Sequence, residues 1–220
     1  MSTEVVPTPK KSRRIIWTSL GMFGLVVAVF TGFILRTINA SPDLQAELER
    51  RDTLYFSSPR DVPVVDLISH KGDVFSTGEF TGQWHVINFG YTYCPDICPV
   101  NMVDMASAYK TLTDQGLSGQ VQMWMVTVDP ARDDVETLAG YVPFFHPDFI
   151  GLTGDEANIQ TLAQQLNTLF YAEGEGDTYT VAHSDNIAII NPQGQYRALF
   201  RPPHTPRQIA EVMAMLIEYD

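Results

Sequence analysis

The chain has only two cysteines in 220 residues, and both lie in one short segment. Cys94 and Cys98 are spaced Cys-Pro-Asp-Ile-Cys, and Pro99 follows directly. Proline favours the first position of a helix, so a helix that begins near Pro99 would place both sulfur atoms close to its N-terminus. The helix dipole stabilises a thiolate there, and the thiolate is the form of cysteine that binds soft metals and exchanges disulfides.

Three kinds of chemistry fit this pair. A purely structural disulfide would close a very short loop, which restricts the unfolded chain little and therefore adds little stability. A redox-active dithiol is the second possibility, although thioredoxin-like reductases separate their two cysteines by two residues and not by three. The third is a soft-metal site, which needs a further ligand from elsewhere in the chain.

Histidine is the natural third ligand, and the chain has five histidines. We expect His70 and His204 to be solvated loop residues, His85 to be an interior group in a strand, and His146 to lie in an aromatic loop. His183 differs, because it precedes a predicted hairpin and, in a thioredoxin-like sheet, this loop faces the segment that carries the cysteines. Two thiolates and one imidazole suit Cu(I), and the same set holds Cu(II) with one further donor.

The cysteines lie between a predicted strand and a predicted helix. Residues 84–91 and 121–128 are apolar without strict alternation, which favours parallel strands that are covered on both faces. Apolar spacing, caps and turn signals predict the remaining elements. These are helices over 99–115, 133–142, 155–170 and 206–217, and hairpins that pair 64–67 with 73–75 and 187–190 with 196–200. Their order predicts an α/β, thioredoxin-like fold with a central mixed sheet and helices on both faces.

An apolar, uncharged run covers residues 15–35 and follows a cluster of four basic residues. Because about 20 apolar residues span a bilayer as a helix, we predict one N-terminal transmembrane helix here. The positive-inside rule then makes 1–14 a cytoplasmic tail. Residues 36–60 are predicted to be a linker and 61–220 the functional domain. A cleaved signal peptide is the alternative, although its apolar region is usually shorter, about 7–15 residues.

The part of the chain after residue 36 is strongly acidic. It contains nine Lys and Arg against 25 Asp and Glu, a formal net charge of −16. This charge argues against nucleic acid and anionic lipid as partners. The N-terminus lacks the Arg-rich and Ser-rich pattern of a transit peptide. We therefore expect a single-pass protein of a bacterial inner membrane, with its C-terminal domain on the periplasmic side.

The chain resembles the Sco/SenC family of membrane-anchored, thioredoxin-fold copper proteins. The resemblance rests on the anchor, on the segment FGYTYCPDICP, on the run from Val128 to Asp133 and on the run that starts at Tyr179. It implies that Cys94, Cys98 and His183 are copper ligands. It also implies a role in assembling the binuclear copper centre of cytochrome c oxidase. The implied partners are the copper-acceptor subunit of the oxidase and an upstream copper donor.

The family commonly carries an acidic residue directly before the ligand histidine, whereas this chain has Ala182 there. Asp185 is a candidate substitute that would orient the imidazole of His183. After the second predicted strand, Arg132 is expected to pair with a carboxylate at the rim of the site. We interpret Asp133 as a helix cap. The methionines do not cluster into a thioether site, so we expect them to fill the core.

The pattern fits a copper metallochaperone better than an enzyme. The alternative is a thiol-disulfide reductase that keeps the copper-ligand cysteines of the acceptor reduced. A membrane-coupled copper or redox sensor ranks behind both, because the short N-terminal tail does not resemble an output module. A zinc hydrolase would need a general base that the sequence does not indicate.

Overall fold

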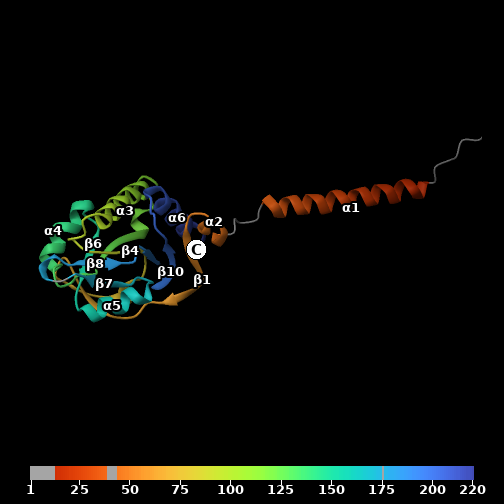
Figure 1. The fold of residues 1–220 in the computed structure, drawn as a ribbon. Coiled ribbons are helices and arrows are strands. Elements are labelled where there is room, and N and C mark those ends of the chain that lie inside the picture. Colours follow the sequence, from red (N-terminus) through yellow and green to blue (C-terminus); the bar gives the residue numbers. More distant parts are fainter. Residues whose placement is uncertain (1–12, 39–43, 175) are drawn as a thin grey trace, which may run out of the picture. The chain divides into compact units, whose positions relative to one another are not determined.

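The computed structural model describes residues 13–38, 44–174 and 176–220 (Figure 1). The chain divides into two compact units, which are Met1–Pro42 and Asp43–Asp220. In the first unit, helix α1 (Arg13–Ile38) covers the segment that we predicted to span a membrane. No helix within the described ranges is both long and apolar enough to cross a bilayer. The predicted transmembrane helix is therefore unconfirmed, and residues 1–12 of the predicted tail lie outside the described ranges.

The second unit is built on an eight-stranded sheet with the order β1-β10-β9-β4-β5-β6-β2-β3 over the described residues. The pairs β4–β5 and β5–β6 are parallel and the other pairs are antiparallel, so the sheet is mixed as predicted. Strands β7 and β8 form a separate antiparallel pair. The strands are β1 (Thr53–Asp61), β2 (Asp66–Ser69), β3 (Val74–Ser76), β4 (Trp84–Gly90), β5 (Val121–Thr127), β6 (Ile150–Thr153), β7 (Phe170–Glu173), β8 (Thr180–His183), β9 (Ile187–Ile190) and β10 (Gln195–Phe200).

Helices cover both faces of this sheet. The helices of the unit are α2 (Leu44–Glu49), α3 (Ile97–Asp114), α4 (Val135–Phe145), α5 (Glu156–Gln165) and α6 (Pro206–Tyr219). Helices α3, α4 and α6 contribute to one apolar cluster, and α5 contributes to a second one on the other side (Figure 1). Strand β4 supplies both clusters, because successive side chains point to opposite faces: Val86 packs in the first and Ile87 in the second.

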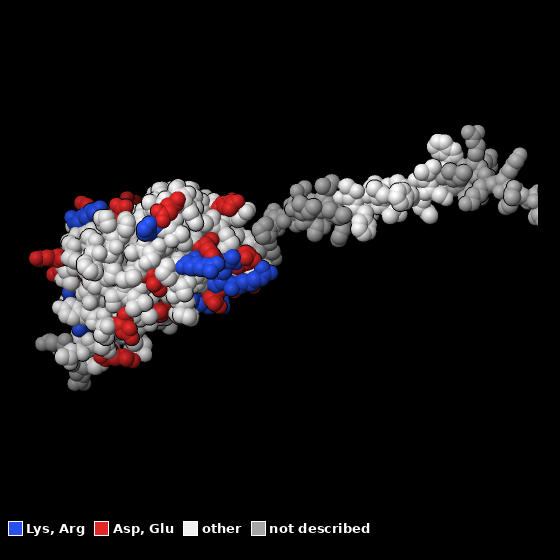
Figure 2. All heavy atoms as spheres, turned by 90° about the horizontal axis from the view of Figure 1, so that it is seen from above, with Lys and Arg blue, Asp and Glu red and all other residues white. Residues whose placement is uncertain are grey.

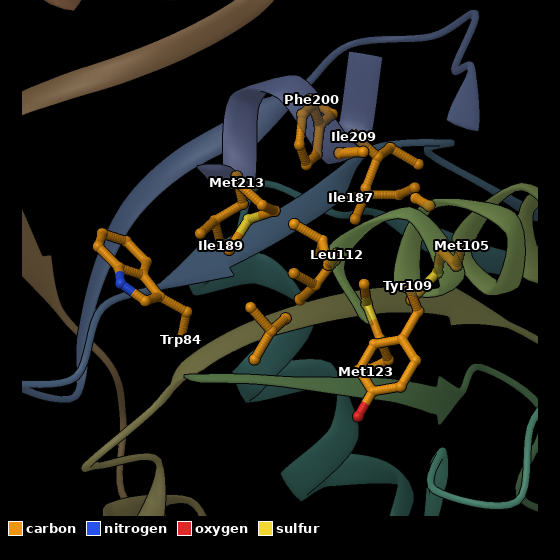
Figure 3. Packing of buried hydrophobic residues seen from close by; sticks show 14 of the residues in the cluster. Trp84, Met105, Tyr109, Leu112, Met123, Ile187, Ile189, Phe200, Ile209 and Met213 are labelled. Atoms are coloured by element: carbon orange, nitrogen blue, oxygen red, sulfur yellow. The ribbon is translucent and has the colours of Figure 1, made fainter. Parts of the chain in front are cut away.

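The first cluster fixes α3 on the sheet. Leu112 of α3 packs among residues that include Ile189 of β9, Met123 of β5 and Met213 of α6, and all four are fully buried (Figure 3). Met102 and Met105 are fully buried as well, so the prediction that methionines fill the core is confirmed for them. A helix that is packed along its length in this way gives a fixed support for the cysteine segment at its N-terminus.

The predicted helix over 155–170 ends earlier than the sequence suggested. Helix α5 stops at Gln165, and Asn167 adopts a left-handed conformation with φ of 61°. Such a conformation ends a helix, and asparagine tolerates it better than most residues. Phe170 already belongs to strand β7, and Leu169, which we had placed on the helix by its spacing, is exposed.

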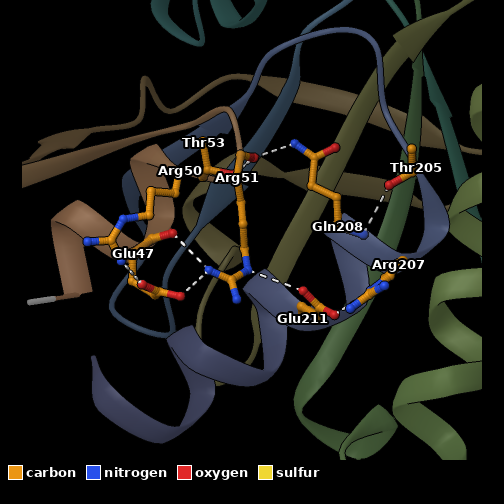
Figure 4. A network of polar contacts seen from close by, with 8 residues as sticks. All are labelled: Glu47, Arg50, Arg51, Thr53, Thr205, Arg207, Gln208 and Glu211. Carbon is orange, nitrogen blue, oxygen red and sulfur yellow. Dashed lines mark hydrogen bonds and ion pairs between the residues drawn. The ribbon is translucent and has the colours of Figure 1, made fainter. Parts of the chain in front are cut away.

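The segment predicted as a linker, 36–60, contributes to the second unit. It contains α2 and most of β1, and β1 pairs with β10. Leu48 of α2 is fully buried in the first apolar cluster. Arg51 binds α2 and α6 together, since its guanidinium contacts Glu47 and Glu211 while its carbonyl oxygen accepts from Gln208 (Figure 4). The compact unit therefore starts near residue 43 and not at 61.

Candidate metal centre

The two cysteines lie where the central strand β4 passes into helix α3. Helix α3 begins at Ile97, two residues before the predicted start, so Cys98 lies in its first turn and is buried. Cys94 precedes the helix and is half-buried. The sulfur of Cys94 accepts a hydrogen bond from the backbone N–H of Cys98 at 3.5 Å. A Cβ atom on Gly90 would lie 3.3 Å from the Cys98 sulfur, so this close approach favours glycine.

His183 is the last residue of β8 and faces the cysteines. Its Nε2 lies 3.3 Å from Sγ of Cys98, and its Nδ1 lies 3.1 Å from the carbonyl oxygen of Ser184. A carbonyl oxygen can only accept a hydrogen bond, so Nδ1 carries the proton. The lone pair of Nε2 is then free to point at the sulfur, which is the tautomer that a metal-binding imidazole requires.

The predicted three side chains are thus brought together. One ligand atom from each of Cys94, Cys98 and His183 lies within 4.8 Å of the other two. Metal–sulfur and metal–nitrogen bonds are about 2.0–2.3 Å long, so ligands around one ion are roughly 3–4 Å apart. A small closing movement would bring the set to bonding distance. Within the described residues, this is the one group of three such side chains with metal-binding geometry.

Burial controls the chemistry of Cys98. It raises the pKa of the Cys98 thiol well above its ordinary value, and a hydrogen bond with Cys94 acts in the same direction. This direction is opposite to our expectation that the helix N-terminus would favour the thiolate, because burial disfavours the charged form of Cys98. A cation that binds here must displace the proton, and the resulting charge is then compensated by the metal itself.

The loop after β5 forms the rim of the site. Arg132 pairs with Asp129 at 2.5 Å, which confirms the predicted arginine–carboxylate pair. The guanidinium of Arg132 also lies 3.7 Å above the Tyr179 ring and donates to the Tyr179 carbonyl oxygen at 3.0 Å. The hydroxyl of Tyr179 in turn donates to Asp129 at 2.5 Å. The rim therefore holds the segment that leads into β8 and His183.

Asp133 is not the helix cap that we predicted. The N-cap of α4 is Asp134, whose carboxylate accepts from the Thr137 N–H at 2.8 Å. Asp133 is fully buried and accepts from the backbone N–H of Thr92 at 3.0 Å, from the Thr92 hydroxyl at 2.5 Å and from the Thr127 hydroxyl at 2.7 Å. Burial raises the pKa of Asp133, and these hydrogen bonds oppose that shift. Its carboxylate thereby fixes the loop that leads to Cys94.

Two of the remaining histidines differ from the sequence-based expectation. His70 and His204 were predicted to be solvated, and both are buried. Nδ1 of His70 accepts from the Gly151 N–H at 2.8 Å, and burial lowers the pKa of His70. Nε2 of His204 lies 2.6 Å from the carbonyl oxygen of Asp185. Backbone groups that need a partner inside the fold explain both positions, and no sequence pattern marks them.

The other two histidines agree with the prediction that His85 is an interior group and that His146 lies among aromatic residues. His85 is buried, and its Nδ1 accepts from the indole N–H of Trp124 at 3.1 Å. Burial lowers the pKa of His85 to about 4. The His146 ring packs edge-on against Tyr109 with the ring centroids 4.7 Å apart.

Sequence reasoning missed a polar cluster beside the site. Asn101 lies one helical turn after Cys98 and donates to the Asp185 carboxylate at 2.5 Å. The Asp185 carboxylate, which we expected to orient His183, therefore binds Asn101 of α3. The imidazole of His183 donates instead to the carbonyl oxygen of Ser184. The one signal for Asn101 was a polar residue on the side of α3 that also carries buried Cys98 and Met102.

The SCO1/SenC family model matches residues 63–218 of the chain. A protein of Stutzerimonas stutzeri that is named for copper binding is 34% identical over 178 residues, which are 80% of this chain and 86% of that protein. The human mitochondrial SCO2 homolog is 34% identical over 147 residues, or 66% of this chain. This chain spans 55% of the length of the human protein.

A solved structure with the same arrangement is that of Arabidopsis thaliana ScoI with copper bound. It matches with a TM-score of 0.66 and 29% identity, over 72% of this chain and 99% of that chain. This match agrees with the predicted thioredoxin-like class of α/β fold. Together with the family model, which covers most of the second unit, it identifies this chain as a member of the SCO1/SenC family.

Proposed function

We propose that this protein binds copper through Cys94, Cys98 and His183 and acts as a copper metallochaperone in the assembly of cytochrome c oxidase. The observation that carries the proposal is the convergence of two sulfur atoms and one imidazole nitrogen within 4.8 Å. Membership in a family that includes a copper-bound structure supports it. The proposed acceptor is the subunit that carries the binuclear copper centre, and an upstream protein would supply the metal.

The donor set suits copper as cargo. Thiolates are soft ligands that favour Cu(I), and imidazole binds both oxidation states. Nδ1 of His183 holds its proton towards Ser184, so Nε2 is available without a tautomer change. Cys94 is the more exposed of the two cysteines, whereas Cys98 is buried. An incoming thiol of the acceptor would therefore displace Cys94 first, and Cys98 and His183 would release the ion last.

The surface of the second unit fits a protein partner better than a polyanion. Figure 2 shows acidic side chains spread over the visible face, with basic side chains gathered mainly in one region. The chain after residue 36 has a formal net charge of −16.

We propose that α1 anchors the protein in a bacterial inner membrane, with the second unit in the periplasm. The basic cluster before the apolar run supports this orientation.

A thiol-disulfide reductase that acts on the acceptor is the second candidate. The two cysteines are free, and the half-buried Cys94 is placed to attack while the buried Cys98 resolves the mixed disulfide. Burial raises the pKa of Cys98, which disfavours it as the attacking residue but not as the resolving one. In this role His183 would be dispensable.

The test is a copper titration of the full chain in detergent, reduced and anaerobic, against a chromogenic Cu(I) chelator. We expect about one copper per chain, because the described residues provide one set of three ligands. His146→Ala is the matched control, since His146 lies outside the site and should leave binding unchanged. The reductase alternative predicts instead that His183→Ala retains dithiol exchange in full and that the wild type binds no copper specifically. That result would overturn the proposal.

A further inference from the structure

Two side-chain contacts link helix α3, which carries Cys98, to the segment that carries His183. Sγ of Cys98 lies 3.3 Å from Nε2 of His183. Three residues further along α3, Nδ2 of Asn101 donates to the carboxylate of Asp185 at 2.5 Å. Residues three apart on a helix lie on the same side, so the two contacts are neighbours. The Asn101–Asp185 hydrogen bond thus fixes the segment that carries His183 against the helix that carries Cys98.

Residues of other elements support this Asn101–Asp185 hydrogen bond, which we call the bridge. Asn101 is 2% exposed, and its amide also lies 3.4 Å from Oδ1 of Asn88 on β4. The carbonyl oxygen of Asp185 accepts from Nε2 of His204, which precedes α6. A hydrogen bond that involves a charged group is stronger than a neutral one. The bridge therefore has the support needed to hold the distance between two ligands when the metal is absent.

Asp185 also brings a negative charge to the site. It lies two residues after His183, and its carboxylate accepts from Asn101, which is one helical turn after Cys98, so the charge lies beside both ligand segments. The field of this charge acts on a bound ion. A nearby negative charge stabilises the more highly charged of two metal oxidation states, and the effect is large where water is excluded. The carboxylate should therefore favour Cu(II) relative to Cu(I).

We propose that Asn101 and Asp185 are positioning residues that set the spacing between Cys98 and His183, and that the Asp185 carboxylate shifts the preference of the site towards Cu(II). This inference rests on the proposed copper binding and deepens it. It assigns roles to two residues that do not touch the metal, and it separates the effect of the bridge from the effect of the charge.

Three substitutions separate the two effects. Asp185→Asn keeps an oxygen that accepts from Asn101 and removes the charge. Asp185→Ala removes both the bridge and the charge. Asn101→Ala removes the bridge from the other side and leaves the carboxylate in place. Asp155→Asn is the matched charge control, because Asp155 caps the remote helix α5 and asparagine caps equally well.

Each variant of the full chain is titrated with Cu(I) and with Cu(II), and the Cu(II) form is examined by electron paramagnetic resonance. We expect Asp185→Asn to raise the ratio of Cu(I) to Cu(II) affinity roughly tenfold. We expect Asn101→Ala to weaken both affinities by about 10- to 100-fold, as the loss of a ligand-orienting contact does in other metal sites. The Asp155→Asn control should match the wild type in both measurements.

A readout without metal tests positioning directly. In the apo protein, the imidazole signals of His183 in nuclear magnetic resonance spectra should form one sharp set for the wild type and for Asp185→Asn. They should broaden or split in Asn101→Ala and in Asp185→Ala, because the segment that carries His183 then lacks the hydrogen bond to α3. If Asn101→Ala does not fold, the comparison of Asp185→Ala with Asp185→Asn still isolates the bridge.

The outcomes distinguish this inference from the proposed function. One possible result is that the wild type binds copper while Asn101→Ala and Asp185→Ala show unchanged affinities and unchanged His183 signals. That result would overturn the positioning role and leave the proposed function intact. An unchanged Cu(I) to Cu(II) ratio in Asp185→Asn would overturn the charge effect. Failure of the wild type itself to bind copper would overturn the proposed function, and this inference with it.

Discussion

The candidate site is made of two segments that are supported in different ways. The cysteine arm, residues 90–98, continues the central strand β4, whose residues are all buried, and ends in the first turn of α3. The histidine arm, residues 180–185, begins with strand β8 of the two-stranded pair outside the main sheet, where His183 lies opposite Phe170. Besides this backbone pairing, Asn101 and His204 bind Asp185, and Arg132 binds the carbonyl oxygen of Tyr179 directly before the arm. A central strand of the main sheet thus places the sulfur atoms, whereas a separate two-stranded pair and polar side chains place the imidazole.

This difference predicts how each arm fails. Changes in the cysteine arm should remove the metal or destabilise the fold, because the arm belongs to the core. Changes around the histidine arm should leave the fold intact and alter how well the site holds copper.

The largest effect is expected for Cys98→Ser in the cysteine arm. Serine is close in shape but is a hard ligand, so the site loses one of its two soft donors. We expect the affinity for Cu(I) to fall roughly a thousandfold, with the free energy of unfolding of the apo protein little changed. The competition titration measures the first and urea denaturation the second. Tight one-to-one binding by this variant would exclude Cys98 as a ligand.

Asp133→Ala should be the most damaging change to the support of the cysteine arm. It leaves the N–H and the hydroxyl of Thr92 and the hydroxyl of Thr127 without their acceptor inside the protein. Buried polar groups without partners are costly, so the free energy of unfolding should fall by about 2–4 kcal/mol. Asp134→Ala is the control, because an exposed helix cap contributes only about 1 kcal/mol. Equal losses in the two variants would contradict the role given to Asp133.

His183→Ala tests the histidine arm. Two thiolates still hold Cu(I), whereas Cu(II) depends more on nitrogen donors. We expect the Cu(II) affinity to fall roughly a hundredfold and the Cu(I) affinity roughly tenfold. Thermal denaturation of the apo protein should show little change, since His183 is only half-buried. A variant that lost stability without losing Cu(II) would show that the histidine is structural.

The smallest effect is a pH dependence that belongs to strand β4. Burial lowers the pKa of His85 to about 4, so the folded protein binds its proton less readily than the unfolded chain does. Its contribution to stability is complete above the ordinary pKa of about 6.5 and is lost as the pH falls towards 4. We expect the wild type to lose about 2 kcal/mol more than His85→Phe between pH 7.5 and 4.5, measured by urea denaturation. Parallel losses would show that His85 titrates normally.

Much of the cysteine arm could be predicted from the sequence. The apolar run of residues 84–91 predicted β4, the spacing of Cys94 and Cys98 predicted a soft-metal site, and the topology placed His183 nearby. These inferences depend on local patterns and on the order of elements, which a single sequence contains. The helix predicted over 99–115 begins two residues earlier and ends one residue earlier, since α3 covers Ile97–Asp114.

The polar contacts that support the two arms could not be predicted in the same way. Asp133 and Asp134 are adjacent carboxylates, and only the packed structure shows which one caps α4 and which one is buried. Asn101 meets Asp185 across 84 positions in the chain. Such long-range polar contacts have no periodicity, because each depends on which buried groups the fold leaves to be paired.

The central claim is that Cys94, Cys98 and His183 bind one copper ion together. Copper K-edge X-ray absorption of the Cu(I)-loaded full chain, beside His183→Ala, tests it most directly. The account predicts two sulfur ligands and one imidazole nitrogen per copper in the wild type, and loss of the imidazole contribution in the variant. A first coordination sphere with fewer than two sulfur atoms, or one that is identical in the two proteins, would contradict it.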